Sequence, residues 1–331
     1  MVTGLCCCLP PWEFEHNGGT PVYFGSGNTS TEVAELESVT GGNGKTVHTS
    51  SVQIQSIACD SNGYIYSIDI NGNITASTRN GIILWTASHG QSGRGIAATG
   101  DGFIYTCGQD VSGFGFIKKW NATTGSEITT GWPYTWDGII LASICVDKSG
   151  NVYSLGRRGA SLQHVVSLNS SGTVRWTSAL PTGAGGGVAD PRGIAINAAN
   201  TQLGIANALL GGGATSFTCH TMDPTSGGVT FSQAHGNSMW SAAYAPDGTL
   251  YLGGTVNAGG FAARINFIQS FIPPSGSQAL GVACGRDNTA YAAVSSTATG
   301  CNKIGGWSKG MPGGATITSA CEHSQGRCGA F

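Results

Sequence analysis

Charge is scarce in this sequence of 331 residues, where Asp, Glu, Lys and Arg together make up only 10%. An average soluble domain has about 25%. The few charges nearly cancel, with 15 basic and 17 acidic residues. A chain without a basic excess cannot neutralise many phosphates, which argues against nucleic-acid binding. Apolar runs long enough to cross a membrane as a helix are also missing. We therefore expect neither a nucleic-acid partner nor insertion into a membrane.

The N-terminus lacks both the basic segment and the apolar stretch of a secretory signal peptide. We therefore expect synthesis and folding in a host cytoplasm, where thiols stay reduced. The chain holds 11 cysteines, an odd number that cannot all pair within one chain. Three of them, Cys6, Cys7 and Cys8, are consecutive. We interpret residues 1–9 as a Cys-rich N-terminal arm.

Glycine, in contrast, is abundant, with 54 residues, and a short motif recurs along the whole chain. A turn is followed by an apolar residue and, in every copy but one, by tyrosine. The copies centre on Tyr23, Tyr66, Tyr105, Tyr153, Gly204, Tyr251 and Tyr291. Their mean spacing is about 45 residues, which is the length of a four-stranded propeller blade. The repeat predicts an all-β fold, a seven-bladed β-propeller of four-stranded antiparallel blades, over residues 10–331.

Two further patterns predict an inner and an outer strand for most blades. Runs of small apolar residues precede the tyrosine motif, as at 56–59 and 193–196, and suit innermost strands that crowd around the axis. Gly-led runs of β-branched and aromatic residues, as at 81–86 and 172–177, are typical of strands, and we place them outermost. Asn-Gly and Asp-Gly pairs between the strands fit tight hairpins.

The first blade needs an innermost strand, and two segments compete for that place. Residues 12–16 alternate between apolar and polar side chains and precede an Asn-Gly-Gly turn, whereas residues 326–331 form a short tail. We favour residues 12–16 and keep the tail as the alternative. In either case we expect the chain ends to meet at one seam. The thiols expected at this seam are Cys6, Cys7, Cys8, Cys321 and Cys328.

Several of the expected blades also carry Asn or Asp, then Thr or Ser and Gly, with Trp nearby. The copies lie at 120–125, 168–176 and 222–227. With these short motifs the chain resembles β-propeller proteins that have quinoprotein-like repeats, and the resemblance implies the propeller fold over nearly the whole chain. Quinone-dependent enzymes of that type have eight blades, a calcium ion and a disulfide between adjacent cysteines. This sequence has only seven expected blades and no cluster that we can assign as calcium ligands. Its adjacent cysteines lie in the N-terminal arm rather than beside a ring cavity. We therefore expect no cofactor and no catalytic residue.

Three aromatic residues, Trp132, Tyr134 and Trp136, are the main candidates for a contact site. They form either a patch that stacks on a sugar or a protein partner, or a cluster folded back over the ring. If the protein binds a partner, we expect the long connections 130–138, 179–192 and 209–216 to be used.

Cysteines provide the remaining candidates. The segment 321–328 contains two cysteines and a histidine, but its spacing matches no strong zinc motif, so we favour free thiols and expect no metal. Cys59, Cys145 and Cys284 fall on inner strands. Because a buried cysteine behaves as a small apolar residue, we expect these three to be buried, reduced and unreactive.

The function that these features favour is a non-enzymatic structural or interaction component of a virus particle. Low charge and abundant small residues fit a bacteriophage tail or capsid-associated protein that is assembled in the host cytoplasm. Its expected partners are other virion proteins in a multi-subunit assembly, or a glycan of the host surface. The alternatives are a carbohydrate-binding, lectin-like propeller and a quinoprotein-like enzyme.

Overall fold

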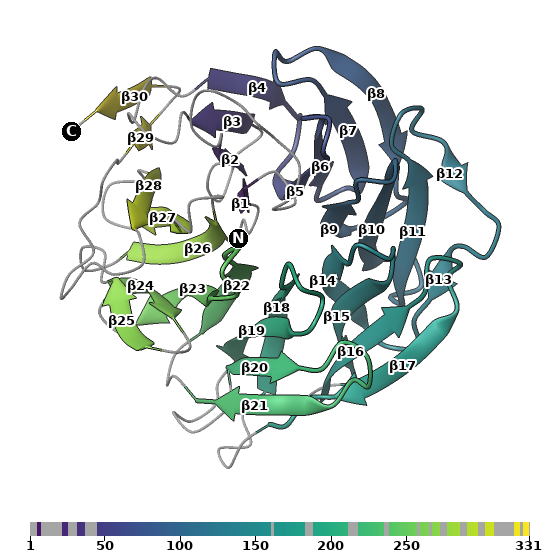
Figure 1. Cartoon of the computed structure of the whole chain (residues 1–331). Helices are drawn as coiled ribbons and strands as arrows, with labels where there is room; N and C mark the ends of the chain where they lie inside the picture. Colours follow the sequence, from purple (N-terminus) through teal and green to yellow (C-terminus); the bar gives the residue numbers. More distant parts are fainter. Residues whose placement is uncertain are drawn as a thin grey trace.

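The computed structural model describes residues 45–159, 162–182, 188–210, 218–234 and 238–256, together with the strands that lie outside these ranges. Throughout these residues the regular structure is β-strand, and no helix among them is long and apolar enough to span a membrane. The described strands form seven antiparallel sheets. Figure 1 shows the sheets following one another around a common centre. The prediction of an all-β, propeller-like fold is confirmed.

Within each sheet the strands follow the order of the chain from the centre to the rim. The first sheet contains β1 (Leu5–Cys7), β2 (Val22–Gly25), β3 (Glu32–Leu36) and β4 (Lys45–Thr49). The second contains β5 (Ile54–Cys59), β6 (Ile65–Asp69), β7 (Asn73–Ser77) and β8 (Ile83–Ser88). The third contains β9 (Gly93–Ala98), β10 (Phe103–Gln109), β11 (Gly115–Asn121), β12 (Glu127–Ile128) and β13 (Tyr134–Thr135).

The remaining four sheets continue the ring. The fourth contains β14 (Ile140–Val146), β15 (Val152–Arg158), β16 (Leu162–Leu168) and β17 (Val174–Ala179). The fifth contains β18 (Val188–Ile196), β19 (Leu203–Leu210), β20 (Cys219–Met222) and β21 (Val229–Gln233). The sixth contains β22 (Met239–Tyr244), β23 (Leu250–Val256), β24 (Gly259–Arg264) and β25 (Phe267–Phe271). The last contains β26 (Ser277–Cys284), β27 (Ala290–Ser296), β28 (Asn302–Trp307), β29 (Cys321–Ser324) and β30 (Arg327–Ala330).

In the second and fourth sheets the recurring tyrosine closes the hairpin between the first two strands. The Tyr66 hydroxyl on β6 donates a hydrogen bond of 2.9 Å to one carboxylate oxygen of Asp60. The other oxygen of Asp60 accepts the backbone N–H groups two and four residues later, at 2.9 Å each. Tyr153 and Asp147 repeat the arrangement at 3.0 Å. In these two blades the tyrosine pattern therefore marks a hydrogen-bonded turn.

We expect Tyr66→Phe to lower the free energy of unfolding by about 1–2 kcal/mol, because it removes a buried hydrogen bond to a carboxylate. Tyr64 is the matched control, since it lies two residues earlier, is only partly buried, and has a hydroxyl without a partner among the described side chains. Tyr64→Phe should change the free energy by less than about 0.5 kcal/mol. Urea denaturation measures both variants, and equal losses would contradict the role of the Tyr66 hydroxyl.

The motif shared with quinoprotein-like repeats joins one blade to the next. Trp85 of β8 donates from Nε1 to a backbone carbonyl of the third sheet at 2.9 Å, and Trp176 of β17 donates likewise to the fifth sheet at 3.0 Å. A Cβ atom at Gly125 would lie 2.6 Å from the Trp85 ring, and one at Gly227 would lie 2.7 Å from the Trp176 ring. Each tryptophan therefore covers the glycine of a turn in the neighbouring blade, which explains why the two residue types recur together.

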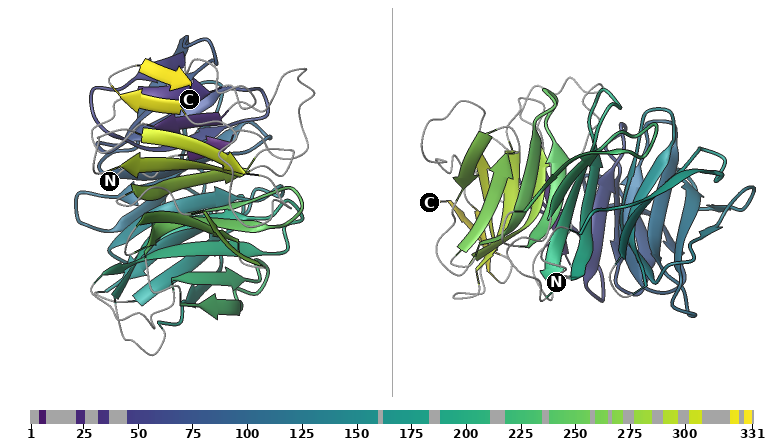
Figure 2. Two further views of the ribbon diagram at one scale, coloured as in Figure 1. Left: turned by 90° about the vertical axis from the view of Figure 1, so that its left-hand side faces the viewer. Right: turned by 90° about the horizontal axis from the view of Figure 1, so that it is seen from below.

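The ring closes between the first and last sheets. Each innermost strand contacts the next around the centre, and β26 contacts β1. In the side views of Figure 2 the strands run from one face of the ring toward the other. Because Leu5–Cys7 pair with β2, the prediction that residues 12–16 form the innermost strand is wrong, and those residues lie outside the described part. The Cys-rich segment that we interpreted as an arm supplies this strand, and its small thiol residues suit a crowded axis.

The chain ends lie at opposite edges of neighbouring sheets. β1 is innermost in the first sheet, whereas β29 and β30 are outermost in the last, as Figure 1 shows. The predicted seam is therefore wrong for these strands, which separate Cys6 and Cys7 from Cys321 and Cys328, and the tail does not pair with the first sheet. The pattern search missed the extra hairpin that carries the tail to the rim. Cys8, and the side chains of the other four cysteines, lie outside the described part.

Candidate functional site

Six innermost strands have a β-bulge at the same place. In β5, Ile54 and Ser56 pair with consecutive residues of β6, so Gln55 between them is the extra residue of the bulge. Arg94 is the extra residue of β9 in the same way. The equivalent bulged residues of the following strands are Ala142, Arg192, Trp240 and Leu280. A β-bulge redirects a side chain, and four of these six residues line one pocket.

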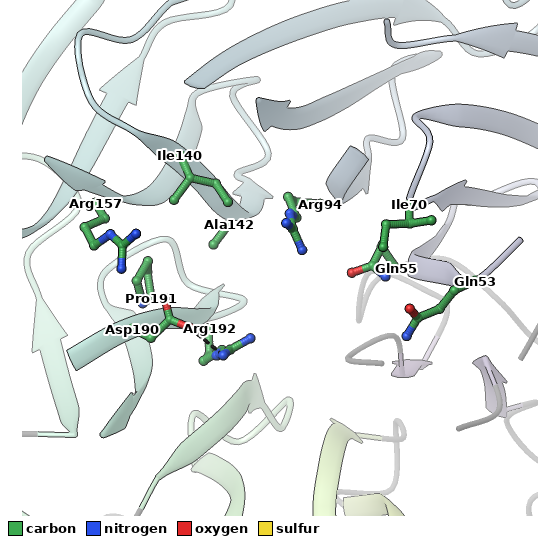
Figure 3. A pocket seen from close by; sticks show the side chains of 10 residues that line it. All are labelled: Gln53, Gln55, Ile70, Arg94, Ile140, Ala142, Arg157, Asp190, Pro191 and Arg192. Atoms are coloured by element: carbon green, nitrogen blue, oxygen red, sulfur yellow. Dashed lines mark ion pairs between the residues drawn. The ribbon is translucent and has the colours of Figure 1, made fainter. Parts of the chain in front are cut away.

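This pocket is a cavity of about 370 Å³ bordered by the innermost strands of four consecutive sheets. The residues that line it are Gln53, Gln55, Ile70, Arg94, Ile140, Ala142, Arg157, Asp190, Pro191 and Arg192. Figure 3 shows these side chains surrounding an open space. We call it the axial pocket. Its volume lies at the lower end of the range of about 300–1,000 Å³ that is typical of small-molecule sites.

Positive charge dominates the axial pocket. Arg192 forms an ion pair with Asp190, but neither Arg94 nor Arg157 pairs with a carboxylate in the part of the chain that the structure describes. Three guanidinium groups against one carboxylate leave an excess of two positive charges. Because both the arginines and the aspartate are only partly buried, this charge faces a cavity that a ligand can enter.

The wall of the pocket also contains hydrogen-bond donors without acceptors. The Nε atoms of Arg94, Arg157 and Arg192 and the Nε2 atom of Gln53 are buried and have no hydrogen-bond partner among the described residues. Leaving a buried donor unsatisfied costs about 1–3 kcal/mol. Three of the four unsatisfied donors belong to the arginines that give the pocket its positive charge, and it is this charge that favours an anionic ligand.

Two neighbours hold the Arg192 side chain in place. Asp190 binds it as an ion pair, and the Trp240 ring lies 4.6 Å from its guanidinium carbon. Burial lowers the pKa of Arg192, and the positive charge of Arg94 lowers this pKa further, while Asp190 acts in the opposite direction. Arginine nevertheless remains charged at neutral pH. An anion placed between Arg94 and Arg192 would relieve their mutual repulsion.

Small residues after the bulges keep the innermost strands close together. Serine and glycine alternate at this position around the ring: Ser56, Gly95, Ser143, Gly193, Ser241 and Gly281. Ser56 Oγ accepts a hydrogen bond from a backbone N–H of β9, and Ser143 Oγ accepts one from β18, both at 3.3 Å. A Cβ atom at Gly193 would lie 2.8 Å from the backbone of β22. This close packing fixes where the four bulged residues that line the axial pocket enter it.

The structure decides against an exposed contact patch at Trp132, Tyr134 and Trp136, which was one of the two interpretations left open by the sequence. Trp132 is 5% exposed and Trp136 is 2% exposed, and both belong to a hydrophobic cluster against which Tyr134 packs. β13 pairs with β11 and ties this connection back onto the third sheet. The alternative interpretation, in which the aromatic residues fold back over the ring, is confirmed. The predicted connection 179–192 contributes to the axial pocket through residues 190–192, which lie in β18, whereas residues 211–216 of the connection 209–216 lie outside the described part.

The inner-strand cysteines differ from one another. Cys145 and Cys284 are reduced, as predicted, although they are partly rather than fully buried, and burial raises the pKa of Cys145. Cys59 is buried but disulfide-bonded, so the prediction that it is reduced is wrong. Its partner lies outside the residues whose side chains the structure describes. A local pattern places Cys59 on an inner strand but carries no information about distant cysteines.

Sequence reasoning missed Arg94, Arg157 and Arg192. A signal existed for two of them, because Arg-Gly-Ile-Ala occurs at 94–97 and again at 192–195. When the inner strands are aligned, the residue just before the position of the recurring Ser or Gly differs in size and charge from blade to blade. Arg157 has no such signal, since it lies at the end of a second strand.

The sequence matches no protein-family model, and no curated protein is significantly similar to it. Solved structures share its fold. A chain of hydrazine synthase from Kuenenia stuttgartiensis matches with a TM-score of 0.71 over 92% of this chain and 94% of that chain, at 11% sequence identity. At this identity the likeness shows the fold alone, and it agrees with the propeller-like architecture.

Proposed function

We propose that the protein is a non-enzymatic interaction component that holds an acidic group of its partner in the axial pocket. The observation that carries this proposal is the excess of arginine over acidic residues in the pocket wall. Guanidinium groups bind carboxylates through charge-assisted and often bidentate hydrogen bonds. An acidic side chain or chain end of a partner is therefore the group that this site fits best.

The setting we propose is a virus particle, in which the propeller is a bacteriophage tail or capsid-associated protein and the partner is a neighbouring virion protein. Low charge and the abundance of small residues support this setting. The sugar-binding alternative loses its main support because Trp132 and Trp136 are buried. Mass spectrometry of purified particles tests the setting. We expect the chain in a fixed ratio to the other virion proteins, and its absence from intact particles would contradict the proposal.

Neighbouring arginines on β15 provide a matched test of binding in the pocket. Arg157 lines the pocket, whereas Arg158 is exposed and pairs with Asp137. We expect Arg157→Gln to weaken binding of a fluorescent hexaglutamate peptide by about 10-fold or more, because it removes a charge-assisted hydrogen bond. Arg158→Gln should change the affinity less than about 2-fold, since exposed ion pairs contribute little. Fluorescence anisotropy measures both, and equal losses would indicate attraction to the surface charge rather than to the pocket.

A further inference from the structure

We infer that the acidic group held in the axial pocket belongs to a partner segment in which apolar side chains flank the acidic residue and pack on an exposed apolar surface beside the pocket. This inference rests on the proposed function and names the chemistry of the partner. The surface, which we call the apolar flank, consists of Val111, Phe114, Ile139 and Leu162, all of which are exposed.

Two residues of the apolar flank are tied to Arg157 in the pocket wall. The backbone N–H of Ile139 donates to the carbonyl of Arg157 at 2.8 Å, and the next residue, Ile140, pairs with Arg157 and lines the pocket with it. Leu162 pairs with Arg158 across the hairpin of β15 and β16. Ile139 and Leu162 therefore lie at the mouth of the pocket, next to a guanidinium group that we expect to bind a carboxylate.

The turn between β10 and β11 holds Val111 and Phe114 beside Ile139. The side-chain amide of Gln109 donates to the carbonyl of Ile139 at 2.8 Å and to a carbonyl of its own turn at 3.0 Å. The Asp110 carboxylate accepts the backbone N–H of Phe114 at 2.9 Å. Because these bonds already fix the turn, a partner that packs on it loses little affinity to the ordering of this surface.

Exposed apolar side chains gather on this part of the molecule. Scattered single ones are normal on a protein surface. Of the large apolar side chains exposed in the described part, five lie at the pocket, namely the apolar flank and Ile70. The others lie in or next to the outermost strands β8, β17 and β21. The apolar flank differs from the run at 82–84 on β8 because it adjoins a positively charged cavity, and this charge specifies what the partner must bring.

Charge complementarity identifies the partner as an acidic residue among apolar ones. The pocket has an excess of positive charge, whereas the one arginine beside the apolar flank, Arg158, is already paired with Asp137. Apolar contacts around a charged pair exclude water and strengthen it. A polyacidic segment can use the pocket alone, but a segment with apolar neighbours around one acidic residue can use both surfaces.

Fluorescence anisotropy with the full chain and three blocked, labelled pentapeptides tests the inference. The peptides are Ser-Leu-Glu-Phe-Ser, Ser-Ser-Glu-Ser-Ser and Ser-Leu-Gln-Phe-Ser, which we call the Leu-Glu-Phe, Ser-Glu-Ser and Leu-Gln-Phe peptides. We expect the Leu-Glu-Phe peptide to bind at least about 10-fold more tightly than either of the others, because it alone brings both a carboxylate and apolar area.

Two phenylalanines provide a matched pair of variants. Phe114 is 48% exposed on the apolar flank, and Phe231 is 41% exposed on the outermost strand β21. Phe114→Ser should weaken binding of the Leu-Glu-Phe peptide by about 5-fold or more, because apolar contact area is lost. It should leave binding of the Ser-Glu-Ser peptide within about 2-fold, and Phe231→Ser should have no larger effect on either peptide.

A second pair repeats the comparison within the fourth sheet. Leu162 and Val174 are similarly exposed, but Leu162 begins β16, whereas Val174 pairs with Leu168 at the other end of that strand. Leu162→Ser should weaken binding of the Leu-Glu-Phe peptide, and Val174→Ser should not. Thermal melting confirms that each variant is folded, and either pair alone decides the outcome.

The outcomes distinguish this inference from the proposed function. Equal affinities for the Leu-Glu-Phe and Ser-Glu-Ser peptides, with both lost in Arg157→Gln, would overturn the inference but retain a pocket that binds an acidic group. Equal losses in Phe114→Ser and Phe231→Ser would indicate general adhesion of apolar peptides and would also overturn it. Failure of every peptide, including hexaglutamate, would overturn the inference and the proposed function together, and vesicles of phosphatidylserine that bind through Phe114 would then identify a lipid surface as the occupant.

Discussion

Lowering the pH from 7 to 5 is expected to reduce the free energy of unfolding by roughly 5–6 kcal/mol, through three buried histidines. His48, His89 and His220 are each less than a tenth exposed. His48 contacts Ser67 at 2.8 Å and Ser77 at 3.0 Å across the boundary between the first two sheets. His89 contacts the hydroxyl of Thr106 at 2.7 Å, again in the following sheet.

Burial sets the direction of this effect. It lowers the pKa of His48 and His220 to about 4, and lowers the pKa of His89 to about 3 with help from the positive charge of Lys118. In the unfolded chain a histidine titrates near its ordinary pKa of about 6.5. Because the unfolded state then binds more protons, stability is retained above pH 6.5 and is lost as the pH falls toward 4. Each histidine contributes about 2 kcal/mol between pH 7 and 5.

Urea denaturation at several pH values measures this loss. His89→Gln should lower the free energy of unfolding at pH 7 and remove about one third of the loss that these three histidines cause, since one of the three groups no longer titrates. Burial also lowers the pKa of His164, which adds to the loss in the wild type and the variant alike. A free energy of unfolding that stays constant from pH 7 to 5 would show that these histidines are protonated at little cost in the folded ring.

A methyl group added at Gly193 is expected to destabilise the ring by about 3 kcal/mol, as overpacking of rigid neighbours does. The new Cβ would lie 2.8 Å from both the nitrogen of Ala242 and the α-carbon of Ser241. These are backbone atoms of β22, so no side-chain rotation relieves the contact. Separating β18 from β22 would also shift Arg192, which precedes Gly193.

Gly63 is the control for this substitution. It has a φ of 78° but no atom within 4 Å of an added Cβ, so Gly63→Ala meets only the backbone cost of about 1–2 kcal/mol. Chemical denaturation compares the two variants. A smaller loss at Gly193 than at Gly63 would contradict the close packing of innermost strands on which the geometry of the pocket depends.

Repetition explains which features could be predicted from the sequence. In two blades the tyrosine motif reflects a local turn, in which Tyr66 and Tyr153 donate to Asp60 and Asp147, six residues earlier. Trp85 and Trp176 likewise recur in equivalent strands, where each covers a glycine of the next blade. Features that repeat in this way indicate the all-β, propeller-like fold without knowledge of any long-range contact.

The axial pocket could not be predicted in the same manner, because it depends on what differs between blades. Arg94, Ala142 and Arg192 occupy one equivalent position and differ in size and charge, and only closure of the ring brings them around one cavity. The disulfide of Cys59 and the hairpin β29–β30 likewise depend on contacts between distant segments. The burial of Trp132 could not be predicted for another reason, because it depends on the pairing of β13 with β11.

A crystal structure of the protein grown with the hexaglutamate peptide tests the central claim most directly. The account predicts a glutamate side chain of the peptide in the axial pocket, with its carboxylate on the guanidinium groups that line the pocket. A structure in which the peptide lies elsewhere, or in which carboxylates of the chain itself occupy all three arginines, would contradict it.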